Sequence, residues 1–114
     1  MAKKKKYLKK NEFRMDLNPA HKGKGMKPHP AYISARYKHK YLANTITHSQ
    51  FTNGVKNYDI IENPNLVSDD ARKIRVSPPF WQSETQFGKD KLTNFKFSKL
   101  ARRRIARYNR KFKK

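Results

Sequence analysis

The sequence predicts an α+β fold, in which a small antiparallel sheet or partly closed barrel carries a basic C-terminal helix. Three observations support this prediction. Segments rich in β-branched and aromatic residues alternate with turn residues between positions 30 and 97. Apolar residues recur at helical spacing in residues 98–114. Residues 1–29 combine dense lysine with glycine and proline, which predicts an arm that is disordered or ordered by a partner.

The arm, residues 1–29, is predicted from like charges that cannot collapse onto one another. Its lysine run comprises Lys3, Lys4, Lys5, Lys6, Lys9 and Lys10. Asn18-Pro19 and the glycines that follow break any helix in the rest of the segment. Met15 and Leu17 are too few to anchor the segment strongly, so we expect residues 1–29 to lie outside the folded body.

The body, residues 30–97, contains segments of strand composition at 32–36, 41–47, 55–61 and 73–76. Residues 37–40 have the length of a hairpin loop, and Asn53-Gly54 is a strong turn dipeptide. A short helical turn is expected at 69–72, and Pro78-Pro79 ends the run of strands. The aromatic residues expected to cover one opening of the sheet are Phe80, Trp81, Phe87, Phe95 and Phe97.

The C-terminal helix, residues 98–114, is predicted from Ser98, a good N-cap, and from the apolar stripe that follows it. The stripe consists of Ala101, Ile105, Tyr108 and Phe112, at spacings of four, three and four residues. The remaining surface of the helix carries the cations Arg102, Arg103, Arg104, Arg107, Arg110 and Lys111. Asp90 is the only acid in residues 89–114, so local carboxylates cannot pair all of these side chains.

The net charge indicates a polyanionic partner. The 114 residues include 29 Lys and Arg against 8 Asp and Glu, which gives a formal charge of +21. Residues 1–29 contribute +8, residues 30–88 only +2 and residues 89–114 +11. Small domains usually carry a net charge of about 2–8 in magnitude, so this excess is strongly self-repelling unless a polyanion neutralises it. RNA or DNA is the partner that the composition favours, ahead of an anionic membrane or an acidic protein.

We expect the two cationic ends of the chain to contact the phosphate backbone. Arginine donates two parallel hydrogen bonds to a phosphate, and each neutralised phosphate releases counterions. The lysine run of the arm and the six helix cations are therefore the predicted nucleic-acid-binding residues. Bases would be contacted by the body, and its candidate stacking rings are Tyr32, Tyr37, Tyr41, Tyr58 and Trp81.

The sequence favours a binding protein over an enzyme. If the chain is an enzyme, the candidate catalytic residues are His48, Arg36 and Thr47, because an imidazole beside an arginine suits phosphoryl chemistry on RNA. Arg75 is a second arginine that could serve there. The chain has no cysteine, and its four histidines fit no metal-binding spacing, so no metal and no cofactor is expected.

Several short motifs in residues 28–100 resemble small basic proteins of plasmids, phages and integrative elements in Gram-positive bacteria. These motifs are Pro28-His29-Pro30-Ala31-Tyr32-Ile33, Lys40-Tyr41, Ile46-Thr47-His48-Ser49, Asn63-Pro64-Asn65 and Phe87-Gly88-Lys89. The strand-rich body with Arg36 and Thr47 is also similar to PemK-like endoribonuclease toxins. That resemblance implies catalysis by an arginine and a threonine or serine near strand ends. The chain departs from the family in lacking its early strand-loop pattern and in carrying basic tails.

The resemblance to mobile-element proteins leaves several roles open. It implies a nucleic-acid-binding protein of a mobile genetic element or ribonucleoprotein, and inhibitors of CRISPR effector ribonucleoproteins are one class of such proteins. Basic tails on a small body are also similar to ribosomal proteins, whose extensions thread between rRNA helices. The sequence contains no bilayer-length apolar run and no signal peptide, so we expect a cytoplasmic protein with no membrane partner.

Overall fold

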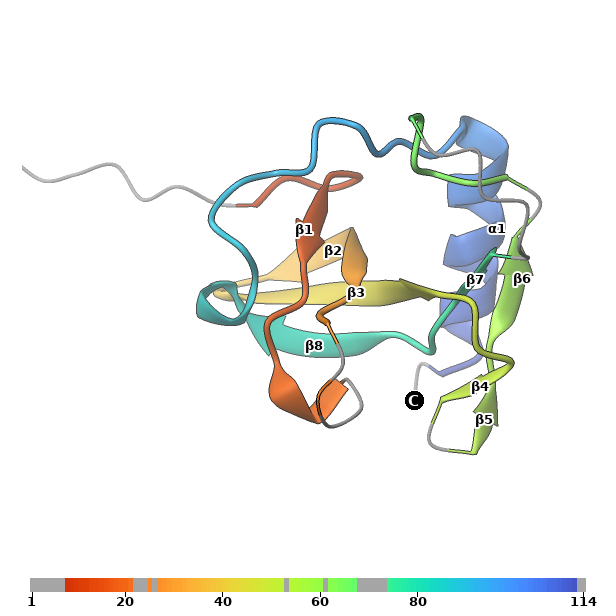
Figure 1. The fold of residues 1–114 in the computed structure, drawn as a ribbon, viewed down its shortest axis with the longest axis horizontal. Helices are drawn as coiled ribbons and strands as arrows, with labels where there is room; N and C mark the ends of the chain where they lie inside the picture. The colour runs from red at the N-terminus through yellow and green to blue at the C-terminus, as the bar shows by residue number, and fades with distance from the viewer. Residues whose placement is uncertain are drawn as a thin grey trace, which may run out of the picture.

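A computed structural model describes residues 8–21, 25, 27–52, 54–60, 62–67 and 74–112. These residues form an α+β fold with a mostly antiparallel sheet and a C-terminal helix (Figure 1). The predicted lysine run from Lys3 to Lys6 and the predicted helical turn at 69–72 lie outside the described residues.

The sheet is built around a hairpin of two long strands. β2 (Pro30–Tyr37) and β3 (Lys40–Thr47) pair antiparallel, and Lys38 and His39 form the turn between them. Lys38 has a φ of 57°, a left-handed backbone conformation of the kind that tight turns use. The prediction of two strands joined by a short loop is confirmed.

Shorter strands extend this hairpin on both sides. β1 (Phe13–Met15) pairs with β2. The other edge of β3 pairs first with β8 (Phe80–Ser83) and then with β7 (Ile74–Val76), and β6 (Tyr58–Ile60) pairs with β7. The order along the sheet is therefore β1-β2-β3-β7-β6, with β8 on β3. β4 (Phe51–Thr52) and β5 (Val55–Lys56) form a separate hairpin, and η1 (Pro19–His21) and η2 (Glu84–Gln86) are 3-10 turns.

The sheet is open. Of the two predicted architectures, the antiparallel sheet is therefore confirmed and the partly closed barrel is wrong. Closure would require the two edge strands, β1 and β6, to pair with further strands around a ring. Each is only three residues long, and they stand at opposite ends of the strand order. An isolated bridge between Asp16 and Phe87 joins the chain after β1 to the chain after η2.

Side chains pack into two clusters on opposite faces of the sheet. Ala31 and Ile33 of β2 belong to one cluster and Tyr32 to the other, because successive strand residues point to opposite faces. The smaller cluster comprises Ala31, Ile33, Tyr41, Ala43 and Phe87. The larger cluster joins the sheet to the helix and comprises Phe13, Tyr32, Ile46, Ile60, Ile74, Val76, Phe97, Ala101, Ile105 and Tyr108.

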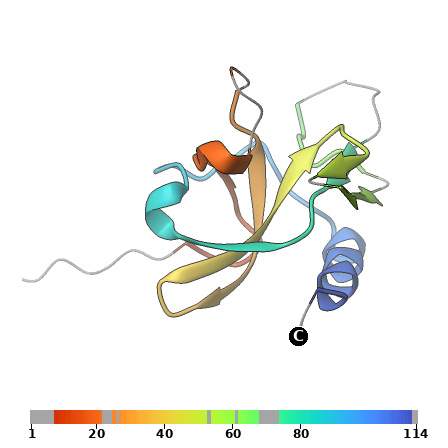
Figure 2. The same ribbon diagram turned by 90° about the horizontal axis from the view of Figure 1, so that it is seen from below.

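Helix α1 (Lys99–Arg110) lies beside β6 and β7 (Figures 1 and 2). Ser98 caps it as predicted, since its hydroxyl accepts a hydrogen bond from the Ala101 backbone N–H at 3.2 Å. Glu62 holds the cap in place, because its carboxylate accepts from the backbone N–H of Ser98 at 3.0 Å and from the Ser98 hydroxyl. Phe112 follows the end of the helix and is exposed, so this member of the predicted stripe is not part of the core.

Part of the predicted N-terminal arm, around β1, belongs to the folded body. Phe13 is only 1% exposed, and the centroid of its ring lies 5.1 Å from that of Phe97 and 5.4 Å from that of Tyr32. Its carbonyl accepts a hydrogen bond from the Leu92 backbone N–H at 2.8 Å. The prediction of an arm is therefore wrong for this stretch, because one large apolar side chain and a partner strand outweigh the surrounding charge.

Two further predictions need correction in the body. The strand predicted at 55–61 is divided into β5 and β6 by Asn57, which is buried and whose side-chain amide donates to the Ser49 carbonyl at 3.0 Å. Pro78-Pro79 does not end the strands, because β8 follows immediately. Phe80 and Trp81 are thus part of the sheet and do not cover an opening in it.

Candidate nucleic-acid interface

The cations of α1 divide into those that line a groove beside the helix and those that do not. Arg102, Arg103 and Arg110 line a groove between α1 and β2. The other predicted cations of the helix, Arg104, Arg107 and Lys111, are exposed and do not line that groove. At about 100° of rotation per residue, Arg104 and Lys111 lie across the buried stripe from Arg102, whereas Arg107 lies on the solvent face next to Arg103. The tertiary structure therefore separates six predicted residues into two sets.

The groove has two parts that meet at Ser34 of β2 and Ala106 of α1. The first part has a volume of about 320 Å³ and is lined by the cations Lys10, Lys99, Arg102 and Arg103. The second part has a volume of about 520 Å³ and is lined by Arg36 and Arg110 together with aromatic side chains. No acidic residue lines either part among the residues that the structure describes. Cations therefore line both parts of the groove.

The aromatic side chains of the second part are Tyr37, Trp81 and Phe112. Tyr37 is 65% exposed and Trp81 is 50% exposed. The other rings predicted to stack on bases are buried or already stacked on another ring. Tyr32 and Tyr41 are buried, and Tyr58 stacks on Tyr108 with 5.1 Å between ring centroids.

Polar contacts hold α1, one wall of the groove, against the sheet. The side-chain amides of Asn44 on β3 and Asn109 on α1 form two hydrogen bonds with each other, and Asn44 also donates to the Ser77 carbonyl at 2.8 Å. Asn44 is 0% exposed. Because an amide pair has directional requirements, this contact sets how α1 sits on the sheet.

Tyr32 forms the floor of the first part of the groove. Its hydroxyl donates to the Asn11 side-chain oxygen at 2.6 Å, and the Asn11 backbone N–H donates to the Ile33 carbonyl at 2.7 Å. Burial raises the pKa of Tyr32 to about 12, although the nearby Arg102 charge acts in the opposite direction. These contacts hold Asn11 against β2, and Lys10, the residue before it, lines the first part of the groove. Lys9 is exposed next to it.

The three candidate catalytic residues are not brought together. Arg36 pairs with Tyr41 at the start of β3, whereas Thr47 ends β3 and His48 follows it. His48 is seven positions after Tyr41 along an extended chain, a span of about 23 Å. Arg75 is the arginine beside this end of β3, since it pairs with Thr47 and donates to the His48 carbonyl at 2.6 Å.

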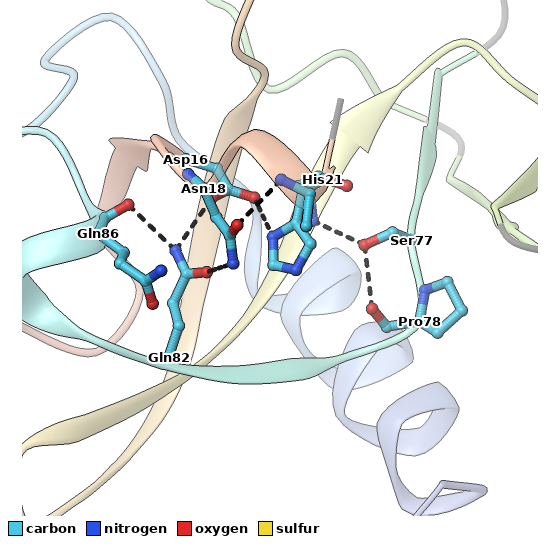
Figure 3. Close-up of polar contacts among 9 residues, drawn as sticks. Asp16, Asn18, His21, Ser77, Pro78, Gln82 and Gln86 are labelled. Carbon is cyan, nitrogen blue, oxygen red and sulfur yellow. Dashed lines mark hydrogen bonds and ion pairs between the residues drawn. The ribbon is translucent and has the colours of Figure 1, made fainter. Parts of the chain in front are cut away.

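His21, which the sequence did not single out, belongs to a network of side-chain hydrogen bonds (Figure 3). His21 Nδ1 lies 2.8 Å from Asp16 Oδ2, and the Asp16 side chain is 1% exposed. Asp16 Oδ1 accepts from the Asn18 backbone N–H and from the Gln82 side-chain amide, each at 3.0 Å. An ionised carboxylate only accepts hydrogen bonds, so a neutral imidazole in this contact donates from Nδ1 and leaves Nε2 as an acceptor.

His21 lines a cavity of about 500 Å³ between η1 and the β4–β5 hairpin. His29, Thr47, Ser49 and Ser77 line the same cavity, with Phe51 and Phe80 among its apolar walls. The centroid of the His21 ring lies 4.3 Å from that of the Phe80 ring. Thr47 is therefore the one member of the predicted catalytic set that reaches this cavity, and its hydroxyl accepts from the Ser49 backbone N–H at 3.1 Å.

The sequence carried little signal for the contact between Asp16 and His21. Asn18-Pro19 predicts a turn between them, and the structure places the 3-10 turn η1 there. A turn does not reveal which buried group the carboxylate meets, because Gln82 comes from a strand 66 residues away. Among the described residues, no group of three or more His, Asp or Glu side chains could hold a metal ion.

Comparisons with known proteins place no constraint on these sites. No family model, no curated protein and no solved structure matches the chain. Within the described ranges, no helix is long and apolar enough to cross a membrane.

Proposed function

We propose that this protein binds RNA or DNA by laying the phosphate backbone along the groove between α1 and β2. The observation that carries this proposal is the set of cations along the groove, with no acid among its described lining residues. Arg102, Arg103 and Arg110 extend from the helix, and Lys10 and Arg36 extend from the sheet side. Cations on both walls suit a polyanion that lies between them.

The fold supports this proposal because it holds the charged helix rigidly. α1 is capped by Ser98 and Glu62 at one end and joined to the sheet by Asn44 and Asn109 near the other. Guanidinium groups on a fixed helix lose less freedom on binding a phosphate than groups on a mobile tail. Arginine on such a helix also offers the planar donor pair that matches phosphate oxygens.

The experiment compares two variants with the same change in charge. Arg103→Gln combined with Arg110→Gln removes two charges from the groove, and Arg104→Gln combined with Lys111→Gln removes two from the flank across the buried stripe. All four side chains are exposed, so neither variant should disturb the core. We expect the first variant to weaken binding of a labelled oligonucleotide by about five- to thirtyfold, and the second to weaken it much less. Equal losses, or no binding by the unmodified protein, would refute the groove as the binding site.

RNA cleavage is a second candidate function, and the contact between Asp16 and His21 is the observation that favours it. Asp16 orients the imidazole so that Nε2 can accept a proton, and His29 and Thr47 line the same cavity. In this proposal Nε2 takes the proton of a ribose 2′-hydroxyl, and the 2′-oxygen forms a bond to the adjacent phosphorus. The bond from phosphorus to the 5′-oxygen breaks, and protonated His29 supplies the proton that the leaving oxygen needs.

This reaction releases a 2′,3′-cyclic phosphate and a 5′-hydroxyl. The test incubates labelled single-stranded RNA with the full chain and identifies the products by mass spectrometry. We expect His21→Ala to abolish cleavage while leaving RNA affinity unchanged, and His39→Ala, in the exposed β2–β3 turn, to cleave normally. Intact RNA after incubation with the unmodified protein, or undiminished cleavage by His21→Ala, would rule the reaction out.

A further inference from the structure

One end of the groove has a different chemistry from the rest. Tyr37, Trp81 and Phe112 surround a hollow of about 520 Å³ that Arg36 and Arg110 also line. The part of the groove beyond Ser34 and Ala106 is lined mainly by cations. The same surface therefore offers charge along its length and aromatic rings at one end.

The tryptophan is held in a defined position. Trp81 lies on β8 directly opposite Leu42 of β3, and both side chains line the hollow. Opposite residues of an antiparallel pair lie on the same face of the sheet with their side chains close together. The Trp81 ring therefore stands on a paired strand with half of its surface exposed, which costs little entropy when a flat ligand stacks on it.

Tyr37 provides a second exposed ring at the end of β2. It pairs with Lys40 across the hairpin, and the Lys38 ammonium lies 5.5 Å from the centroid of its ring. Arg36 precedes it on the same strand and lines the hollow with it. An aromatic face beside cations suits a flat base that is attached to a phosphate.

We propose that this hollow binds unpaired bases, so that the protein prefers single-stranded nucleic acid to a duplex. The inference rests on the proposed nucleic-acid binding and adds the class of strand that is bound. In a duplex each base face is covered by its neighbours, so Trp81 and Tyr37 cannot stack on it without unstacking a base pair. In a single strand the phosphates can follow the cations while the bases turn toward the rings.

Trp81 is the only tryptophan in the chain, so its fluorescence reports directly on the hollow. The experiment titrates the full chain with oligo-dT and oligo-rU of about 12 nucleotides, with a duplex of matched length, and with poly-glutamate. Fluorescence anisotropy of labelled strands gives the affinities. We expect both single strands to quench Trp81 and to bind more tightly than the duplex. Poly-glutamate, which has charge but no bases, should leave the emission unquenched.

Variants of the rings separate stacking from charge. Trp81→Ala and Tyr37→Ala should each weaken single-strand binding by roughly 5- to 150-fold and leave duplex binding nearly unchanged. Trp81→Phe should retain most of the affinity, because a flat ring remains. Leu66→Ala is the control, since Leu66 is 63% exposed and lines neither the groove nor the cavity beside His21.

The outcomes distinguish this inference from the proposed function. A duplex that binds as tightly as the single strands, or unchanged single-strand affinity in both Trp81→Ala and Tyr37→Ala, overturns the stacking proposal while phosphate binding stands. If no nucleic acid binds, the proposed function itself fails. Tyr37 is largely exposed, so Tyr37→Ala keeps the test decisive even if Trp81→Ala does not fold.

Discussion

Asn44 and Asn109 lie 65 residues apart in the chain and exchange hydrogen bonds through their side-chain amides. The Asn44 amide donates to the Asn109 oxygen at 2.8 Å, and the Asn109 amide donates back at 3.1 Å. Asn44 belongs to the central strand β3, and Asn109 belongs to the last turn of α1. This pair therefore connects the wall of the cationic groove to the sheet that supports its floor.

Asn44→Ala should destabilise the protein by about 2–4 kcal/mol, because it leaves the Asn109 amide and the Ser77 carbonyl without their buried partner. Urea unfolding followed by circular dichroism measures this loss. Asn94→Ala is the control, since Asn94 is exposed and its substitution should change stability by less than about 0.5 kcal/mol. Similar values for the two variants would show that the amide pair contributes nothing specific.

Phe13→Ala should cost about 3–5 kcal/mol, the usual range for deleting a buried aromatic ring. Phe13 is in contact with Tyr32, Phe95 and Phe97 in the larger core. Leu17, four residues later and half exposed, provides the comparison. A thermal unfolding transition that shifts no further for Phe13→Ala than for Leu17→Ala would mean that β1 does not contribute to the core.

Stability should fall as the pH rises above about 10, because burial raises the pKa of Tyr32 to about 12 from 10.0. A raised pKa means that the folded state holds the phenolic proton more tightly. Its contribution is fully present below the unfolded pKa and is lost between pH 10 and 12. Urea unfolding over this range, with tyrosinate absorbance recorded in parallel, should show a smaller decline in Tyr32→Phe. Tyr37→Phe, at an exposed ring, should keep the full decline.

Binding of a single strand should weaken steeply with salt. The described cations lining the groove are Lys10, Arg36, Lys99, Arg102, Arg103 and Arg110. If each neutralises one phosphate, the slope of log affinity against log salt is about −4, at about −0.7 per contact. Arg103→Gln with Arg110→Gln should reduce it to about −3. Anisotropy titrations over a series of salt concentrations measure the slope, and an identical slope in this variant would place the phosphate contacts elsewhere.

The sequence alone determined the elements whose signals are local. The hairpin of β2 and β3 was predicted from strand composition on either side of a short loop. The capped helix was predicted from Ser98 and from the spacing of Ala101, Ile105 and Tyr108, which are all buried. Such features depend on neighbouring residues and on the periods of a strand or helix, so a single sequence contains them.

Only the tertiary structure decided which distant residues meet. Strand pairing buries Phe13 in the core, although the residues near it in the sequence are charged. It also places Arg36 and His48 at opposite ends of β3. It also brings Asp16, His21 and Gln82 together. Which of the helix cations line the groove depends in the same way on where α1 docks. Contacts of this kind join residues far apart in the chain, and no local pattern specifies the register and packing that create them.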